Sequence, residues 1–285
     1  MHTHAATERA AIVTGATSGI GRALALELHR RGHVVYATGR NPAALAELAA
    51  NGLRTIAVDV ANAQDRAALA DRLAADGVGV RLLINNAGYG LMGPLAEIPI
   101  DEVRHQLEVN TIAPLALTQL LLDTLIADGD GRVVNISSVS GVLVTPFAGA
   151  YCASKATLNA LSDALRMELA PLGIRVTTVQ PGHIASSFGA TASTTTERDY
   201  TASRYAPIRD AIADRANASQ HNATPADDFA RTLLDAVLAT ATPPVITLGR
   251  GGRPLVALGR FAPARVRDRI LSRRFRLYHL AQKAR

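Results

Sequence analysis

The sequence predicts a single α/β domain over residues 1–285, with a doubly wound parallel sheet of about seven strands and helices on both faces. Three observations lead to this fold class. Short apolar runs alternate with longer segments of helical periodicity, as in successive βαβ units. Glycines separate the first apolar run from the first helical segment. Hydrophobic residues make up 48% of the chain, which is enough for a sizeable core.

The first of these units contains a glycine-rich segment. Residues 9–14 are predicted to form a buried strand, and the leucine pattern up to Arg31 indicates a helix. Between them lies Thr14-Gly15-Ala16-Thr17-Ser18-Gly19-Ile20-Gly21. Glycines at such a turn let the backbone approach a pyrophosphate, which then lies at the helix N-terminus. The spacing differs from G-x-G-x-x-G, so a turn that is tight for structural reasons alone is the alternative.

The second predicted strand, residues 33–38, is followed by Gly39 and Arg40. In a dinucleotide-binding fold, an acidic residue near this point binds the ribose 2′-hydroxyl, and an arginine suits a 2′-phosphate. The pair therefore favours NADP(H) over NAD(H). A solvated loop arginine without a binding role is the other interpretation of Arg40.

Four further strands are each followed by polar residues or glycine, and a polar-faced helix is predicted over residues 63–75. The helical segment 100–125 contains Pro114, which removes the hydrogen bond to the carbonyl of Asn110 and predicts a kink there. The strands are 54–58 before Asp59-Val60, 81–84 before Asn85-Asn86-Ala87-Gly88, 132–136 before Ser137-Ser138, and 174–180 before Pro181-Gly182.

Tyr151-Cys152-Ala153-Ser154-Lys155 begins a helical pattern that continues to Leu172. A tyrosine and a lysine four residues apart share one face of a helix. A free phenol has a pKa of about 10, and a nearby ammonium lowers that value, which makes the phenol a usable general acid or base. The pair alone is equally compatible with the surface of an ordinary helix.

In order, these motifs resemble the short-chain dehydrogenase/reductase family, whose members are single-domain Rossmann-type oxidoreductases. The family pattern is T-G-x-x-x-G-x-G, N-N-A-G, a helix asparagine, a serine, Y-x-x-x-K and P-G, and the sequence supplies it between residue 9 and about residue 188. The segments 85–90 and 146–166 are similar to the branch of 17β-hydroxysteroid and retinol dehydrogenases. Ser186 stands where many members have threonine, and both carry a hydroxyl.

The resemblance implies four catalytic residues. Ser138 would orient the substrate oxygen, unless it only caps a turn, and Tyr151 would exchange a proton with that oxygen. Lys155 would lower the pKa of Tyr151 and bind the nicotinamide ribose, while Asn110 would hold a water that connects Lys155 to solvent. The implied cofactor-binding residues are Gly15, Thr17, Ser18, Gly19, Ile20, Gly21, Arg40, Asp59, Val60, Asn86, Ala87, Gly88, Tyr151, Lys155, Pro181, Gly182 and Ile184.

The substrate pocket is expected at the carboxyl edge of the sheet, as in open α/β sheets generally. Its candidate residues are mostly apolar and suit a lipophilic alcohol or ketone. His183 is interpreted as a pocket wall or hydrogen-bond donor, because Tyr151 already fills the acid/base role. The candidates are Tyr89, Leu91, Ser138, Leu143, Val144, Phe147, His183 and Phe188.

The segment 189–222 is polar and weakly patterned, which predicts a mobile substrate lid. Thr224-Pro225 predicts a helix start, with the threonine as N-cap and the proline at N1, and the helix runs to about Ala239. Residues 245–248 are predicted to form the last strand.

Residues 250–285 form a basic extension: they hold eleven Lys/Arg and one acid, against a formal charge of −4 over the first 249 residues. Because the basic charge belongs to the extension, we expect no nucleic-acid partner. Residues 263–285 are predicted to form a basic amphipathic helix. It could lie on an anionic membrane surface, but we favour a place over the pocket mouth or a subunit interface.

The function expected from the resemblance is NADP(H)-dependent hydride transfer with a lipophilic ketone, aldehyde or secondary alcohol, steroid- or retinoid-like or another hydrophobic carbonyl compound. The alternatives are a catalytically silent NADP(H) sensor and a membrane-surface protein on the same fold. We expect a homodimer or homotetramer and no metal. One cysteine and an N-terminus without an apolar segment indicate a cytoplasmic protein.

Overall fold

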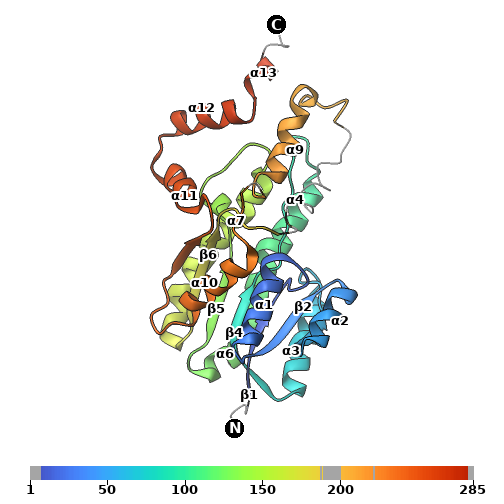
Figure 1. Cartoon of the computed structure of the whole chain (residues 1–285), viewed down its shortest axis with the longest axis vertical. Helices are drawn as coiled ribbons and strands as arrows, with labels where there is room; N and C mark the ends of the chain where they lie inside the picture. Colours follow the sequence, from blue (N-terminus) through green and yellow to red (C-terminus); the bar gives the residue numbers. More distant parts are fainter. Residues whose placement is uncertain (1–7, 187, 189–199, 221, 282–285) are drawn as a thin grey trace.

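A seven-stranded parallel sheet of order β3-β2-β1-β4-β5-β6-β7 forms the centre of the molecule in the computed structural model (Figure 1). The structure describes residues 8–186, 188, 200–220 and 222–281. The strand order changes direction between β1 and β4, and ligands bind at such a point in open α/β sheets. The strands are β1 (Glu8–Val13), β2 (Val34–Gly39), β3 (Arg54–Ala57), β4 (Val78–Asn85), β5 (Arg132–Ile136), β6 (Arg175–Pro181) and β7 (Val245–Leu248).

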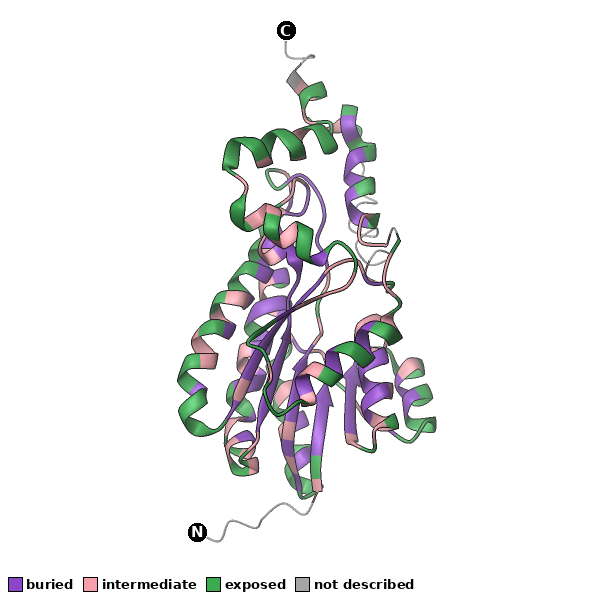
Figure 2. Ribbon diagram, turned by 60° about the vertical axis from the view of Figure 1, so that its left-hand side comes forward, coloured by how far each residue is buried: buried purple, intermediate pink, exposed green. Residues whose placement is uncertain are grey.

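Helices cover both faces of the sheet, so the predicted fold class is confirmed. Alternate residues of β1 enter opposite cores: Ala11 and Val13 belong to one, Ala10 and Ile12 to the other. Figure 2 shows the strands buried between the helices. The first core lies under α1 (Gly19–Arg30), α2 (Pro42–Ala50) and α10 (Ala226–Leu238), and the second under α3 (Ala63–Ala75), α5 (Ala113–Leu120), α6 (Leu122–Asp128) and α7 (Gly149–Leu169).

The predicted helix 100–125 is interrupted twice. It begins as α4 (Ile100–Leu107), widens into a π-helix over Glu108–Ile112 and continues as α5 and α6. The kink predicted at Asn110 is confirmed, because Pro114 has no N–H for the regular ladder. Among the described residues no single helix is long and apolar enough to span a membrane; α4–α5 and α6 pass that test only as a pair bent by 57°, and Leu117 and Leu125 of this pair are buried against the sheet.

Part of the predicted lid is helical. Ala206–Ile208 forms a 3-10 turn, and α9 (Arg209–Asn217) follows it. Ile208 and Ile212 are buried, with 3% and 0% of their surface exposed. Residues 189–199 and 221 lie outside the described residues, and the mobility of the segment stays a prediction.

The C-terminal extension forms α11 (Gly252–Phe261), α12 (Ala264–Arg274) and α13 (Tyr278–Ala281), above the carboxyl edge of the sheet in Figure 1. The prediction of one continuous helix from residue 263 is wrong, because Arg276 has a left-handed backbone with a φ of 57°. Figure 2 shows α12 mostly exposed. Phe275 is 7% exposed, whereas Val266, Ile270 and Tyr278 are 46–50% exposed, so the predicted apolar face is buried at Phe275 but not at the residues on either side of it.

The remaining boundaries agree with the predictions to within a few residues, and three features differ. Neither α2 nor α11 was predicted, and β4 begins three residues earlier than expected, at Val78. Helix α10 begins at Ala226 with Pro225 as its N-cap, so the predicted cap is wrong. The hydroxyl of Thr224 instead accepts the backbone N–H of Arg250 at 3.1 Å.

Candidate functional site

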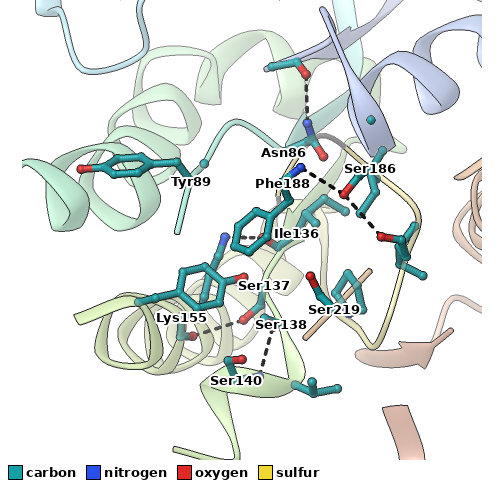
Figure 3. Close-up of a pocket in the computed structure, with 18 of the residues that line it drawn as sticks. Asn86, Tyr89, Ile136, Ser137, Ser138, Ser140, Lys155, Ser186, Phe188 and Ser219 are labelled. Atoms are coloured by element: carbon teal, nitrogen blue, oxygen red, sulfur yellow. Dashed lines mark hydrogen bonds between the residues drawn. The ribbon is translucent and has the colours of Figure 1, made fainter. Parts of the chain in front are cut away.

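A cavity of about 1280 Å³ lies at the carboxyl edge of the sheet, where strands β1 to β6 end. Residues from the β1–α1 turn lie on one part of its wall, and α11, α12 and Phe275 on another. Figure 3 shows its centre, with Ser137, Ser138 and Lys155 close together. The predicted site residues on its wall are Gly15, Thr17, Ser18, Gly19, Ile20, Arg40, Asp59, Val60, Asn86, Ala87, Gly88, Tyr89, Ser138, Leu143, Tyr151, Lys155, Pro181, Gly182, His183, Ile184 and Phe188.

The glycine-rich turn presents backbone to the cavity. Gly15 has a φ of 64°, and a Cβ there would lie 2.8 Å from the Cα of Ala87. Gly21 does not line the cavity; it packs against the carbonyl of Gly15, 2.3 Å from where its Cβ would be. The N-terminus of α1, with no acid in its first turn, follows directly. This turn therefore fits the pyrophosphate of a dinucleotide, since free N–H groups and the helix dipole both favour an anion.

Thr14 and Asn86 join this turn to the end of β4. The hydroxyl of Thr14 accepts the backbone N–H groups of Asn86 and Ala87, each at 3.0 Å. The Asn86 side chain donates to the carbonyls of Thr14 at 2.9 Å and Gly15 at 3.2 Å. Figure 3 shows one bond from this side chain as a dashed line. Asn86 thus holds the turn in place. Thr14 was missed as a site residue, although its place directly before the first glycine was a usable signal.

Arg40 lies at the end of β2 and is 74% exposed at its side chain. Its Nη1 is 3.6 Å from a carboxylate oxygen of Asp59, which is half-exposed. Gly39 packs beneath Thr17, since a Cβ at Gly39 would lie 2.5 Å from Thr17 Cγ2. The arrangement places a cation on the wall that an adenosine ribose would approach, and most of the guanidinium is exposed to solvent.

Tyr151 and Lys155 lie one turn apart on α7, and both line the cavity. They are 7% and 5% exposed, which excludes the surface-pair interpretation. Lys155 Nζ donates to the carbonyl of Ile136 at 2.8 Å (Figure 3). The lysine carbonyl accepts the Ser137 hydroxyl at 3.2 Å. These bonds hold α7 against the end of β5.

Burial dominates the ionisation of this pair. It raises the pKa of Tyr151 to about 12, against the lowering effects of a hydrogen bond with Ser138 and of the Arg215 charge. It also lowers the pKa of Lys155 to about 8. The pKa of Tyr151 is thus raised overall, and the cation that acts against this rise is Arg215; the expected lowering by Lys155 stays a prediction. Tyr151 is therefore protonated at neutral pH and able to donate a proton.

Ser138 combines the two roles considered for it. It is the N-cap of the 3-10 turn Val139–Gly141, and its Oγ accepts the N–H of Ser140 at 3.0 Å (Figure 3). It also lines the cavity and is hydrogen-bonded with Tyr151. Capping fixes the hydroxyl beside the phenol.

Asn110 lies behind the wall and does not line the cavity. Its amide nitrogen donates to the Tyr89 carbonyl and the Ser154 hydroxyl, each at 3.0 Å, and its oxygen accepts the Tyr89 N–H at 3.1 Å. The π-helix turns this fully buried side chain toward both segments. Asn110 therefore positions the chain after β4 against α7; its expected water stays a prediction.

On the substrate side, the ring of Phe188 lies 5.2 Å from that of Tyr151. His183 is fixed by backbone bonds, its N–H donating to Arg250 and its carbonyl accepting from Thr224. Three expected pocket residues do not line the cavity. Val144 is 57% exposed, whereas Leu91 and Phe147 are buried, the latter against the rings of Tyr205 and Phe275.

Sequence reasoning missed several polar wall residues. Arg215 on α9 is 8% exposed and binds the hydroxyls of Thr145 and Ser140. Nothing in the polar sequence of α9 separates Arg215 from its solvated neighbours. Ser140 could have been found from its position two residues after Ser138.

The fold and this site together define a dinucleotide-dependent oxidoreductase, with a phosphate cradle, a ribose pocket and a buried serine, tyrosine and lysine around one cavity. The family model for short chain dehydrogenases matches residues 9–197. The chain belongs to the short-chain dehydrogenase/reductase family and is an oxidoreductase that uses NAD(P). Within the described ranges, no group of three His, Cys, Asp or Glu residues could hold a metal ion.

Two curated relatives illustrate the match. The uncharacterized oxidoreductase YbbO of Escherichia coli K12 is 38% identical over 196 residues, which are 65% of this chain and 72% of that protein. The mouse dehydrogenase/reductase SDR family member 7B is 35% identical over 193 residues, 64% of this chain and 60% of that protein.

Solved structures share the fold. A short-chain dehydrogenase from Streptomyces avermitilis superposes with a TM-score of 0.74 at 28% identity, covering 96% of this chain and 99% of that one. A family member from Burkholderia phymatum, in complex with NAD, gives 0.72 at 26% identity over 85% and 90% of the two chains. A serine dehydrogenase complexed with NADP+ gives 0.73 over 84% and 94%, at an identity of 24% that shows the fold alone.

Proposed function

We propose that this protein is an NADP(H)-dependent reductase of lipophilic ketones or aldehydes that also oxidises lipophilic secondary alcohols. One observation carries the proposal: the hydroxyls of Ser138 and Tyr151 and the ammonium of Lys155 meet on one wall of the cavity that also contains the glycine-rich turn. A sensor that only binds the cofactor needs no such phenol.

The chemistry is a balanced exchange at one carbonyl. When bound, NADPH would supply the hydride that the carbonyl carbon accepts, and its nicotinamide would be oxidised. Tyr151 donates its hydroxyl proton to the carbonyl oxygen, which Ser138 orients by a hydrogen bond. Lys155 would bind the ribose hydroxyls. Because the pKa of Tyr151 is raised to about 12, the phenol is protonated at neutral pH, which supports the reductive direction.

The cofactor preference rests on Arg40. Its exposed guanidinium lines the cavity after β2, where the adenosine ribose would lie. A guanidinium meets a 2′-phosphate with parallel charge-assisted hydrogen bonds, whereas position 39 has no carboxylate for a ribose 2′-hydroxyl. These features support NADP(H) over NAD(H).

The substrate class rests on the apolar part of the cavity wall. Its aliphatic and aromatic side chains suit a lipophilic body, such as a steroid- or retinoid-like carbonyl compound, in line with the 17β-hydroxysteroid and retinol dehydrogenase branch. They are Leu143, Phe188, Leu255, Leu258, Ile270, Leu271 and Phe275.

Assembly and location are also proposals. Ile112, Leu120 and Met167 are 44–62% exposed on α5, α7 and the π-helix between α4 and α5. Their exposure supports a homodimer or homotetramer through these helices, in which the side chains would be buried between copies. The free, buried Cys152 supports a cytoplasmic protein. Because α12 is rich in basic residues, binding to an anionic membrane surface is the alternative role of the extension.

A substrate screen tests the function. NADPH and NADH oxidation is measured with steroid, retinoid and aliphatic ketones and aldehydes, using the wild type and Tyr151→Phe. We expect turnover of at least one lipophilic carbonyl compound, faster with NADPH and absent in the variant. Tight NADPH binding without turnover of any compound would support the catalytically silent sensor instead.

A further inference from the structure

Arg215 is a buried cation on the wall of the catalytic cavity. It lies near the end of α9, and 8% of its surface is exposed. Its Nε donates to the Thr145 hydroxyl at 2.8 Å, and one Nη2 contact reaches the Ser140 hydroxyl at 3.5 Å. Both partners are neutral, so neither balances the guanidinium charge.

No carboxylate of the described residues forms an ion pair with Arg215. Burial lowers its pKa, and the groups that oppose this shift are the weakly acidic Cys152 and Tyr151. Arg132 is a useful comparison, because it is 5% exposed but lies 3.0 Å from Asp130. Burying an unpaired charge is costly, so a protein keeps one where something else supplies the opposite charge.

The cavity offers the place for that charge. Ser138, Ser140, Tyr151 and Arg215 all line it. Ser140 links two of these residues: its hydroxyl lies 3.5 Å from Arg215 Nη2, and its N–H donates to the Ser138 hydroxyl at 3.0 Å. A group that binds Arg215 would therefore lie near a carbonyl held by Ser138 and Tyr151. Around them the wall is apolar, with Leu143, Leu258 and Phe188 among its residues.

We propose that Arg215 binds a carboxylate of the substrate, so that the enzyme acts on hydrophobic oxo acids and hydroxy acids. This substrate class rests on the proposed function. One guanidinium balances one carboxylate, and the planar groups match in geometry. Arg274 also lines the cavity but is exposed. Its charge is hydrated and attracts anions, but it does not need an opposite charge to offset burial, as Arg215 does.

Binding of unreactive probes tests the site without turnover. Affinities of octanoate and the matched neutral octanamide are measured by calorimetry on the protein saturated with NADP+. The wild type should bind octanoate at least tenfold more tightly, and Arg215→Met should reduce this preference to less than threefold. Arg209→Met is the matched control, because Arg209 lies on the same helix with a 67% exposed side chain, and it should behave as the wild type.

A kinetic experiment then links the site to the reaction. The ratio of kcat/KM for 3-oxooctanoate to that for its methyl ester is measured with NADPH, in the same three proteins and in Arg215→Lys. The wild type should prefer the acid at least tenfold, Arg215→Met should lose the preference but still reduce the ester, and Arg215→Lys should retain part of it.

The outcomes separate the two proposals. Equal affinities in the wild type, or a preference that survives Arg215→Met, would overturn the carboxylate site and leave the reductase proposal intact. If Arg215→Met slowed acid and ester equally and shifted the pH profile, Arg215 would be a positioning residue for Tyr151, and the inference would also fall. Arg215-dependent octanoate binding without reduction of either ketone would contradict the reductase proposal alone.

Discussion

The ammonium of Lys155 donates a hydrogen bond of 2.8 Å to the backbone carbonyl of Ile136 at the end of β5. This contact is one of the hydrogen bonds that hold the catalytic helix against the sheet. The hydrogen bond does not compensate for the hydration that the ammonium loses on burial, because burial still lowers the pKa of Lys155 from 10.5 to about 8. The folded chain therefore holds this proton more weakly than the unfolded chain does.

We predict that Lys155→Met makes the protein more stable at pH 7 but inactive. Below pH 8 the wild type must bury a charge, at a cost of roughly 1.4 kcal/mol per pKa unit. After allowance for the lost hydrogen bond, we expect the free energy of unfolding of the variant to be about 1–3 kcal/mol higher than that of the wild type. From pH 8 to 10.5 the unfolded wild type binds more protons than the folded one, so its stability rises with pH and the gain shrinks. Urea unfolding at pH 7 and 10 measures this; a less stable variant at pH 7 would refute the prediction.

Tyr151→Phe should lower kcat at least a hundredfold while changing NADPH affinity less than threefold. The substitution removes the proton donor but keeps the ring that packs against Phe188 at 5.2 Å. Steady-state NADPH oxidation and a fluorescence titration of the cofactor measure the two effects. Retention of more than a few per cent of the wild-type rate would show that another group donates the proton.

Arg40→Ala should weaken NADPH binding by roughly one to two decades and leave NADH binding unchanged, because a charge-assisted hydrogen bond contributes about 1.5–3 kcal/mol. The single variant is the cleaner test, since aspartate at Gly39 would force its Cβ within 2.5 Å of Thr17 Cγ2. Arg22→Ala is the control, as Arg22 is paired with Glu47 outside the cavity. A wild type that prefers NADH would contradict the assignment of Arg40.

Glu27→Gln should destabilise the fold at pH 7 by about 1–2 kcal/mol. Hydrogen bonds from Arg30, the largest cause, and from Arg31 lower the pKa of Glu27 from 4.5 to about 2. The side chain of Arg30 is 68% exposed, so solvent screening reduces the effect. The stabilisation is complete above pH 4.5 and is lost as the pH falls toward 2. Thermal unfolding from pH 7 to pH 2 should show the two proteins converging; a constant difference would argue against ionisation as the cause.

The sequence by itself determined the sheet and the cofactor half of the site. Apolar runs in the sequence predicted the strands. The site was predicted from the glycines, Asn86 and the Tyr151–Lys155 spacing, which are short local patterns or directly follow a strand. Parallel strands end at one edge, so residues that follow them meet there whatever the details of packing.

Only the tertiary structure decided which residues line the substrate half of the cavity. Arg215 became a site residue because α9 packs over Ser140 and Thr145, 70 or more residues earlier in the chain. Likewise, Phe147 does not line the cavity, because its ring packs against the rings of Tyr205 and Phe275. The ionisation of Tyr151 was also decided there, since burial raises its pKa to about 12 against the lowering effects of the Ser138 hydrogen bond and the Arg215 charge. Burial depends on every segment that covers a group, and no local pattern in the sequence records it.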